Sequence, residues 1–378
     1  MNQSPLNWDD VFVGRRQIIE KLSTDQGHYF IFGARRIGKT SLLKFFEKSF
    51  WEKSIPAFYF SIQGDTDPHR IIRKIENAFR RKSNQFKHPE IIPASKNTLF
   101  DFLDELDSRL NRQKIIFLID EIEQIHEIEK QEAGFIEKLR NAVESSENIR
   151  YILTASPHFK RIVSNAGGSA FLSAFNNAIL PIMTQDEICE LIHKLIPKIK
   201  NDVLEQILNF THYQPYLVKI FLGKLLKDGQ LQRPSRELAQ ECYITNVLDG
   251  IFPNYLAGLS VEEQNIVRQI QQKKFSFKER YETKLKELEK YGYLKIEQGR
   301  YVIPNWFFEH WLSGETSEKA PPVNPVQLLN KSKFAKVTDY FQVAANKLIV
   351  KIVLIIIALI ITYFLGNKIG LLDLLKLE

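Results

Sequence analysis

Short apolar runs alternate with amphipathic helical patterns along the first half of the chain. Runs rich in β-branched and aromatic residues predict buried strands, and the stretches between them repeat apolar residues at helical spacing. Such alternation is typical of an α/β fold with a mostly parallel sheet covered by helices. We expect five strands, of which the last has the weakest pattern, at residues 28–33, 57–62, 115–119, 151–154 and 177–180.

The pattern changes after Thr184, where helical periodicity continues without clear strands. We therefore expect the sheet-bearing core to occupy residues 1–183 and a small helical lid to follow it over residues 184–250. Domains commonly contain about 100 to 200 residues. A chain of 378 residues has room for this core and for smaller units after it.

Residues 251–312 predict a third unit that begins with helices. Ser260 and Glu263 have the spacing of a capping box, in which each residue satisfies a backbone N–H at the start of a helix, and they predict a helix through Gln272. A second amphipathic helix is predicted over residues 278–291.

A β-hairpin is expected at the end of this unit. The strand-like segments 294–297 and 300–303 flank Gln298 and Gly299, and glycine supplies the positive φ that a tight turn needs. Helices followed by a hairpin indicate a winged-helix-like domain over residues 251–312.

A strongly apolar stretch, LIVKIVLIIIALIITYFL, begins at Leu348. As a helix rising about 1.5 Å per residue it nearly spans a hydrocarbon core of about 30 Å. We predict one transmembrane helix over residues 348–366, between a linker and juxtamembrane segment at 313–347 and a short tail at 367–378. A buried helix of a soluble domain is less well supported, because little sequence follows to cover it.

The charges before this stretch predict its orientation. The positive-inside rule places the large N-terminal portion in the cytoplasm of a single-pass membrane protein. The lysines on which this expectation depends are Lys331, Lys333, Lys336 and Lys347.

Composition and cysteine content exclude few classes of protein. The net charge of +7 permits contact with nucleic acid or anionic lipid but selects neither. Cys189 and Cys242 are far apart and form no CxxC pair, so they support neither a disulfide framework nor a zinc finger. Cys189 and His193 share a helical spacing that is more typical of core packing than of a metal site.

The segment GARRIGKTS matches the P-loop pattern G-x-x-x-x-G-K-[ST] and lies between a predicted strand and a predicted helix. Backbone N–H groups of such a loop surround phosphate oxygens, Lys39 neutralises phosphate charge, and the Thr40 hydroxyl can ligate Mg²⁺. The predicted nucleotide-binding residues of this segment are Gly33, Ala34, Arg35, Arg36, Ile37, Gly38, Lys39, Thr40 and Ser41.

The segment IIFLIDEIEQI supplies the second half of the predicted site. Asp120 ends a buried strand and can hold Mg²⁺ together with Thr40. Glu121 follows directly and can polarise an attacking water molecule. Together with Lys39 these residues predict hydrolysis of a bound nucleotide, although the sequence does not give its rate.

The ordered set of motifs resembles the STAND and archaeal-type ATPase branch of the AAA+ P-loop NTPases. The resemblance covers about residues 11–221 and is carried by FVGRR (12–16), GARRIGKTSLL (33–43), LIDEIEQI (118–125), TAS (154–156) and YQP (213–215). It implies an AAA+ fold with a helical lid, and a preference for ATP. No guanine-reading NKxD-like motif lies near the site.

The resemblance also implies roles for residues outside the P-loop. Three residues are implied to border the adenine: Val13, Gly14 and Arg15. Thr154 and Ser156 match the position of the sensor-1 polar residue, and Pro215 matches the lid motif GxP. This chain departs from the family in two places, since it lacks the glycine two residues before Pro215 and has Ala155-Ser156 where relatives tend to have Gly-Ser.

The most direct functional hypothesis is a membrane-anchored ATPase that switches conformation in signalling or defence. An ATP-dependent DNA-binding protein is the first alternative, with residues 278–291 as the recognition helix. The alternating lysines and glutamates of that segment are more typical of a solvated helix than of a basic groove-binding face. A nucleotide-gated scaffold with little turnover is the second alternative. A protein partner and a homo-oligomer remain open.

Overall fold

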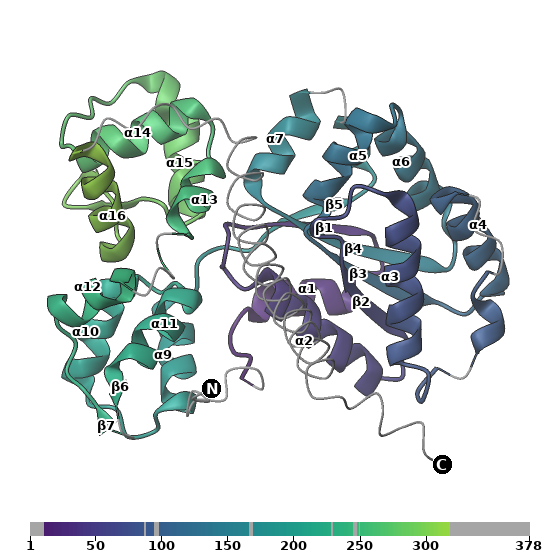
Figure 1. Cartoon of the computed structure of the whole chain (residues 1–378), viewed down its shortest axis with the longest axis horizontal. Coiled ribbons are helices and arrows are strands. Elements are labelled where there is room, and N and C mark those ends of the chain that lie inside the picture. Colours follow the sequence, from purple (N-terminus) through teal and green to yellow (C-terminus); the bar gives the residue numbers. More distant parts are fainter. Residues whose placement is uncertain are drawn as a thin grey trace, which may run out of the picture. The chain divides into compact units, whose positions relative to one another are not determined.

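The five predicted strands form one parallel sheet with the order β2-β3-β4-β1-β5 (Figure 1). Every residue of β3 and β4 is buried, which explains why their sequences are continuous apolar runs rather than alternating ones. The α/β fold with a parallel sheet is thus confirmed. The strands are β1 (Tyr29–Phe32), β2 (Ala57–Ser61), β3 (Ile115–Asp120), β4 (Ile149–Ala155) and β5 (Asn176–Ile179).

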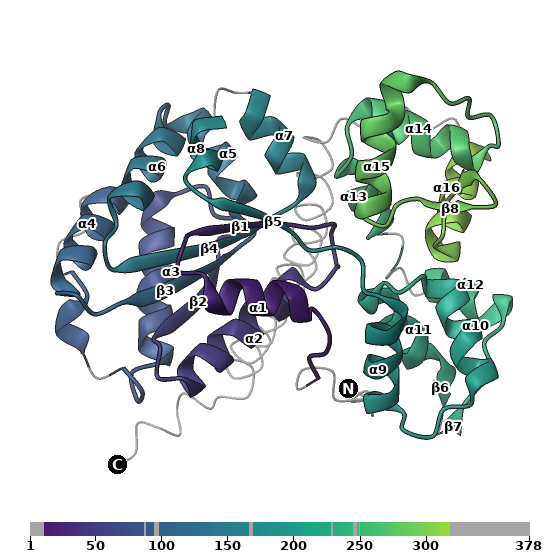
Figure 2. The same ribbon diagram turned by 180° about the vertical axis from the view of Figure 1, so that it is seen from behind.

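Helices cover both faces of this sheet (Figure 1, Figure 2). Tyr29 and Ile31 pack against one layer, whereas Phe30 and Phe32 pack against the other, because successive side chains of a strand point to opposite faces. The first layer contains α1 (Arg16–Thr24) and α2 (Lys39–Glu52). The second contains α3 (Pro68–Arg81), α4 (Leu99–Arg109), α5 (Ile125–Gln131), α6 (Phe135–Ser145), α7 (Pro157–Asn165) and α8 (Ser169–Ser173), with the short turn η1 (Pro89–Ile91) between α3 and α4.

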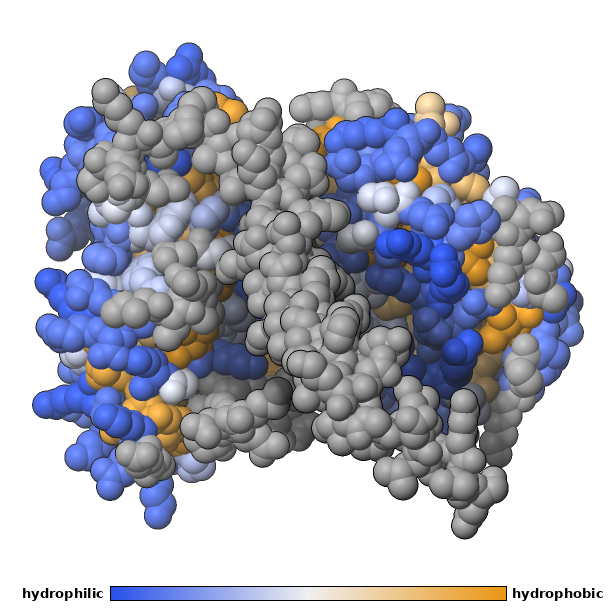
Figure 3. Space-filling view, viewed as in Figure 1, coloured by the Kyte–Doolittle hydropathy of each residue, from blue (hydrophilic) through white to orange (hydrophobic). Residues whose placement is uncertain are grey.

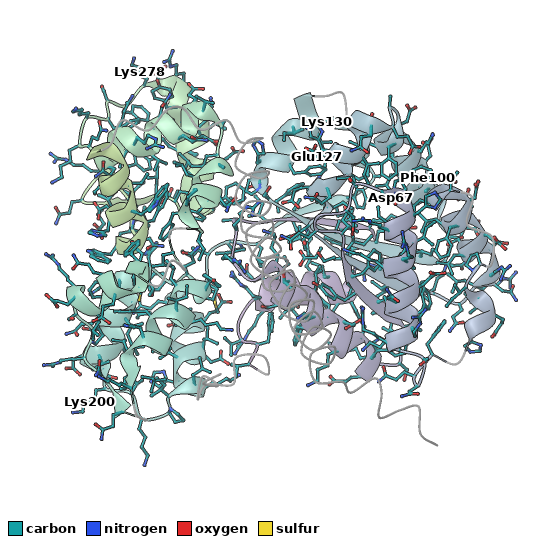
Figure 4. The ribbon with its side chains drawn as sticks, in the orientation of Figure 1. Asp67, Phe100, Glu127, Lys130, Lys200 and Lys278 are labelled. Atoms are coloured by element: carbon teal, nitrogen blue, oxygen red, sulfur yellow. The ribbon has the colours of Figure 1, made fainter. Side chains whose placement is uncertain are left out.

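Local sequence fixes where these helices begin. The carboxylate of Asp67, labelled in Figure 4, accepts a hydrogen bond of 2.9 Å from the backbone N–H of His69, and Pro68 occupies the first position of α3. Thr98 caps α4 in the same way, through the N–H of Asp101. Polar caps of this kind satisfy N–H groups that have no partner within the helix.

Helices follow Thr184, as the change in periodicity predicts. Thr184 and Glu187 form a capping box at the start of the first of them, at a spacing that is also visible in the sequence. The elements of this lid are α9 (Gln185–Leu195), α10 (Asn201–Thr211), α11 (Pro215–Leu225), the two-residue strands β6 (Leu226–Lys227) and β7 (Gln230–Leu231), and α12 (Arg236–Ile244).

A C-terminal module, Phe252–Ser317, contains the predicted helices and hairpin. The capping box of Ser260 and Glu263 is present at the start of α14, which confirms that prediction. The elements are α13 (Phe252–Ala257), α14 (Val261–Gln271), η3 (Glu279–Tyr281), α15 (Glu282–Lys290), β8 (Lys295–Glu297), β9 (Arg300–Val302) and α16 (Trp306–Ser317).

Two predicted boundaries of this module are wrong. The helix expected from Lys278 begins as the 3-10 turn η3 and becomes α-helical only at Glu282, because Lys278 itself is extended, with φ of −134°. The linker expected from Ser313 begins later, since α16 continues to Ser317. The Gln298-Gly299 turn is present with positive φ at both residues, as the hairpin requires.

The lid and the C-terminal module share one hydrophobic core. Phe210 of α10 lies edge-on to Trp306 of α16, with ring centres 5.1 Å apart. Phe221 of α11 meets Phe307 of α16 in a similar way at 5.4 Å. The lid and the C-terminal module are therefore packed directly against each other.

The structure is a computed structural model that describes residues 11–317, except residues 87, 94–97, 166–168, 228–229, 245–247 and 249. All described residues belong to one compact unit, Met1–Lys319. The predicted transmembrane helix at 348–366, most of the linker and the tail lie outside the described residues. Within the described part, no helix has the length and apolar character needed to cross a membrane. Hydrophilic side chains cover much of the face of this unit that Figure 3 shows.

The turn between α10 and α11 generates a prediction about pH. His212 and Tyr213 both have positive φ, at 42° and 57°. Burial, reinforced by Lys295, lowers the pKa of His212 to about 4, with Glu297 acting in the opposite direction. The unfolded chain binds this proton near the ordinary pKa of about 6.5. The contribution of neutral His212 to stability is therefore complete above about pH 6.5 and is lost as the pH falls towards 4.

We expect His212→Asn to reduce this pH dependence, because asparagine tolerates positive φ and does not titrate. Urea unfolding of both proteins at pH 7 and at pH 4.5 measures the effect. Comparison of the two proteins removes the contribution of other titrating groups. A difference in unfolding free energy that is the same at both pH values would show that His212 is not held neutral in the folded state.

Candidate active site

The P-loop connects β1 to α2 and takes its shape from two residues with positive φ. Gly38 has φ of 104°, and a β-carbon there would meet no atom of the described neighbours within 4 Å, so the backbone angle alone requires glycine. Arg36 has φ of 62°, a conformation that costs a non-glycine residue about 1 kcal/mol or more. At Gly33 a β-carbon would lie 3.0 Å from Ile37 and 3.2 Å from the Leu180 carbonyl oxygen. A larger residue at position 33 would therefore require Ile37 or Leu180 to shift by a few tenths of an ångström.

All nine predicted residues of the P-loop segment lie together at the end of β1 and the first turn of α2. Ala34 and Ile37 are buried against the core, Arg35 is half-buried, and Ser41 is exposed on α2. Helix α2 begins at Lys39, directly after Gly38. Its first N–H groups and its dipole are thus available to an anion at this point.

Lys39 folds back over the loop that precedes it. Its Nζ donates to the carbonyl oxygens of Gly33 and Ala34, at 2.8 and 3.1 Å. Burial lowers the pKa of this ammonium, whereas the carboxylates of Glu123 and Asp120 act to raise it. The ammonium group of Lys39 thus binds two uncharged carbonyl oxygens, and a negatively charged phosphate can replace them as its hydrogen-bond acceptor.

The carboxylate of Asp120 joins three elements of the core. It accepts hydrogen bonds from the Thr40 hydroxyl at 2.5 Å, from the Thr154 hydroxyl and, more weakly, from the Tyr59 hydroxyl at 3.4 Å. Asp120 is only 2% exposed. The backbone N–H of Glu121 adds a further bond at 3.0 Å.

Thr40 and Asp120 fit a site for Mg²⁺. A hydroxyl and a carboxylate are hard oxygen ligands, and Mg²⁺ in nucleotide sites uses one or two such groups together with phosphate oxygens. The 2.5 Å separation of the two oxygens shows that the structure brings them together, although 80 residues separate them in sequence. When bound, the ion neutralises charge on the phosphates.

Glu121 lies at the carboxyl end of β3 in a left-handed conformation, with φ of 55°. Such a conformation is uncommon for a residue other than glycine and is often found at functional sites. Burial raises the pKa of this carboxyl, and Glu123 and Asp120 raise it further. A raised pKa makes the carboxylate a better proton acceptor.

Thr154 and Ser156 lie at the carboxyl end of β4, next to Asp120. The Thr154 side chain is completely buried, and its hydroxyl donates to Asp120. The backbone N–H of Ser156 donates to Glu123 Oε1 at 2.6 Å. In this structure both residues support the acidic groups of the site, and contact with phosphate or water remains a prediction from the resemblance.

Arg15 connects the P-loop, the end of the sheet and the lid. Its guanidinium donates to the carbonyl oxygens of Pro181 at 2.5 Å and Ile37 at 3.0 Å. Its backbone N–H donates to the carboxylate of Glu187, in the first turn of α9. Burial lowers the pKa of Arg15 to about 10, and Glu187 opposes this shift. The buried guanidinium thus uses its hydrogen bonds on backbone carbonyl groups of the protein.

The two residues before Arg15 complete this junction. Val13 is buried in the core that the lid shares with the C-terminal module, where Ala34 of the P-loop also lies. Gly14 has φ of 69°, and a β-carbon there would lie 2.6 Å from the side chain of Glu187. Glycine is therefore needed where the chain passes the lid. A role of these residues at the adenine remains a prediction.

Pro215 is the first residue of α11, but the next residue makes the direct contact with the P-loop. The guanidinium of Arg36 lies 4.7 Å from the centre of the Tyr216 ring. A cation over an aromatic face at this distance is an attractive contact. The predicted lid motif is thus next to the P-loop in space, through a residue that the motif does not include.

Sequence reasoning missed four residues of this region. They are Tyr59, Glu123, Glu187 and Tyr216. Glu123 had a signal, since it lies two residues after Glu121 in the same acidic segment. The capping-box spacing of Thr184 and Glu187 was also visible. Tyr59 and Tyr216 gave no signal, because only the tertiary fold brings them to the site.

Comparison with known proteins supports an ATPase. Residues 22–163 match the AAA domain family. A Walker-type ATPase of Pyrococcus abyssi has a similar structure, with a TM-score of 0.55, 16% sequence identity, and coverage of 83% of this chain and 99% of that chain. Comparison with curated protein sequences gives no match.

Two further solved structures have lower scores. The ORC2 protein of Aeropyrum pernix, in ADPNP and ADP complexes, has a TM-score of 0.49 and 15% identity, with coverage of 80% of this chain and 93% of that chain. A STAND protein of Pyrococcus horikoshii with a tetratricopeptide repeat sensor has a TM-score of 0.39 and 15% identity, with coverage of 83% and 45%. The AAA domain and the P-loop fold support an ATPase that binds ATP with Mg²⁺.

The position of Arg15 leads to a prediction for which a substitution of the neighbouring Arg16 provides the control. Arg15→Ala removes hydrogen bonds from a buried charged group, so we expect it to lower the free energy of unfolding by about 2–3 kcal/mol and to weaken ATP binding through the P-loop. Arg16 is exposed, and Arg16→Ala should change stability by less than about 0.5 kcal/mol. Urea unfolding and ATP titration of both variants measure these effects. Equal behaviour of the two variants would contradict the assignment.

Proposed function

We propose that this chain is a membrane-anchored ATPase of the STAND-like kind that acts as a switch in signalling or defence. Binding and hydrolysis of Mg-ATP at the P-loop changes the position of the lid, and the C-terminal module moves with the lid. A nucleotide that contacts two regions only when they are close can shift a protein between open and closed states.

The observation that carries this proposal is that the lid contacts the P-loop itself. Arg36 reaches from the loop to Tyr216 of the lid, and Arg15 holds both Ile37 of the loop and Glu187 of the lid. Phosphate binding requires the backbone N–H groups of this loop to close around the anion. A change in the conformation of the P-loop therefore also acts on its contacts with Tyr216 of the lid and with Arg15, which binds Glu187 of the lid.

A buried amide pair extends this connection to the C-terminal module. The side-chain N–H of Asn305 donates to the Gln214 side-chain oxygen at 3.0 Å, and the two residues are 4% and 5% exposed. Asn305 Oδ1 also accepts from the backbone N–H of Phe308 in the first turn of α16. Because buried polar groups are costly to leave unpaired, this bond favours joint movement of α11 and α16.

The membrane anchor and the winged-helix-like module are further parts of the proposal. The apolar segment at 348–366 and the lysines before it support a single span with the ATPase in the cytoplasm. The order α14, α15 and a β8–β9 hairpin supports a winged-helix-like module, which we assign to output or sensing. A protein partner or a second copy of the chain would be engaged there.

Binding of duplex DNA through the same module has less support. Lys284 pairs with Glu262, and Lys286 pairs with Glu282 at 2.6 Å. Lys278, labelled in Figure 4, lies at the outer edge of the module, just before η3. Lysines that already pair with carboxylates release less free energy on contact with phosphates.

Phosphate release from ATP by the detergent-solubilised full chain tests the proposed function, with Lys39→Ala and Glu121→Gln as variants. We expect Lys39→Ala to lose ATP binding, because the phosphate charge is no longer neutralised. Glu121→Gln should retain ATP binding and lose about 100-fold or more in turnover, since positioned acid–base groups contribute about 10²–10⁴.

The same assay distinguishes the alternatives. Stimulation by duplex DNA, rather than by lipid vesicles, would favour the DNA-binding protein. Tight ATP binding by the wild type without phosphate release, with or without DNA and lipid, would favour a nucleotide-gated scaffold and contradict the proposed switch by hydrolysis.

A further inference from the structure

Glu123 connects the ends of two central strands at the candidate active site. It lies in the 3-10 turn η2 (Ile122–Gln124), which follows the acidic pair at the end of β3. Its Oε1 accepts the backbone N–H of Ser156, the first residue after β4, at 2.6 Å. The carbonyl oxygen of Ser156 in turn accepts the N–H of Phe159, at the start of α7. Glu123 therefore fixes the backbone where β4 passes into α7.

The second oxygen of this carboxylate is buried. Among the described residues, Glu123 Oε2 is a buried atom for which the structure shows no hydrogen-bond partner. Glu123 is also the acidic residue with the largest effect in raising the pKa of Lys39, ahead of Asp120. A buried carboxylate is stabilised by a nearby positive charge. Glu123 is thus part of the charge balance around the P-loop lysine.

The other acidic residues of the site do not perform this task. Asp120 accepts from Thr40 and Thr154, so both of its oxygens are engaged. Thr154 and Ser156 are separated by one residue on the same strand end. The bond between Glu123 and Ser156 thus fixes the backbone two residues from Thr154, beyond the point where β4 pairs with β1 through Ala155 and Phe32.

We propose that Glu123 is a positioning residue for ATP hydrolysis, which holds the backbone at Ser156 so that Thr154 and Asp120 keep their places beside the phosphates and Mg²⁺. This inference rests on the proposed ATPase function. It assigns to Glu123 the acceptance of a hydrogen bond, not proton abstraction, which remains with Glu121. Small displacements of catalytic groups reduce turnover strongly, by up to about 100-fold for 1 Å.

Two substitutions of Glu123 distinguish the loss of its hydrogen-bond acceptor from the loss of its negative charge. Glu123→Gln retains an oxygen that accepts from the Ser156 N–H, whereas Glu123→Ala removes the acceptor. We expect kcat to fall about 10-fold or more in Glu123→Ala, with the Kd for ATP changed by less than about threefold, because the lost interaction acts on the chemical step. Glu123→Gln should retain more than about one third of the wild-type kcat.

A second carboxylate in the chain provides a matched control. Glu129 accepts the backbone N–H groups of Gly134 at 2.9 Å and Ile136 at 2.7 Å, at the start of α6. This is the same kind of bond between a carboxylate and the backbone, outside the site. Glu129→Ala should leave kcat per ATP-binding site unchanged.

If Glu123→Ala does not fold, Glu123→Met replaces it, since methionine has a similar size without a strong acceptor.

The outcomes are distinguishable. A wild-type kcat in the alanine or methionine variant, with turnover in the wild type, would overturn the role of Glu123 alone. Inactivity of Glu123→Gln equal to that of Glu121→Gln would also overturn it, because the charge rather than the acceptor would then be required. Absence of turnover in the wild type would overturn the proposed function and this role together.

Discussion

The hydrogen bond between Thr40 and Asp120 is the contact on which the rest of the site depends. It joins the first turn of α2 to the end of β3, at an oxygen separation of 2.5 Å. The same carboxylate accepts from Thr154 on β4 and from Tyr59 on β2. A buried carboxylate needs several donors to be stable. The architecture thus places the candidate Mg²⁺ ligands Thr40 and Asp120 where three strands and a helix meet.

The parallel sheet favours this convergence of side chains. In a parallel sheet the carboxyl ends of all strands lie at one edge, and ligands of open α/β folds bind there. Strand β1 lies between β4 and β5, with the P-loop directly after it. The acidic end of β3 and the polar end of β4 are therefore near the loop without any special adjustment. Only the chain direction and the strand order are required.

Much of this arrangement could be predicted from the sequence. Strand positions follow from apolar runs, and the P-loop and the Asp120-Glu121 pair follow from local patterns. Side chains that reach the site across long sequence separations could not be predicted in the same way. Tyr59 contacts Asp120 from a neighbouring strand, and Tyr216 contacts Arg36 from the lid. No local pattern distinguishes such residues from ordinary core or surface aromatics.

In the proposed mechanism the lid and the C-terminal module respond to the P-loop as one body. Hydrogen–deuterium exchange of the full-length Glu121→Gln variant, with and without Mg-ATP, tests this claim most directly. We predict that ATP changes the exchange of backbone amides in the P-loop, in the first turn of α11 and in the first turn of α16 together, and that Asn305→Ala reduces the change in α16 more than the change in α11. A change confined to the P-loop and α2 would contradict the claim that nucleotide binding reaches the module.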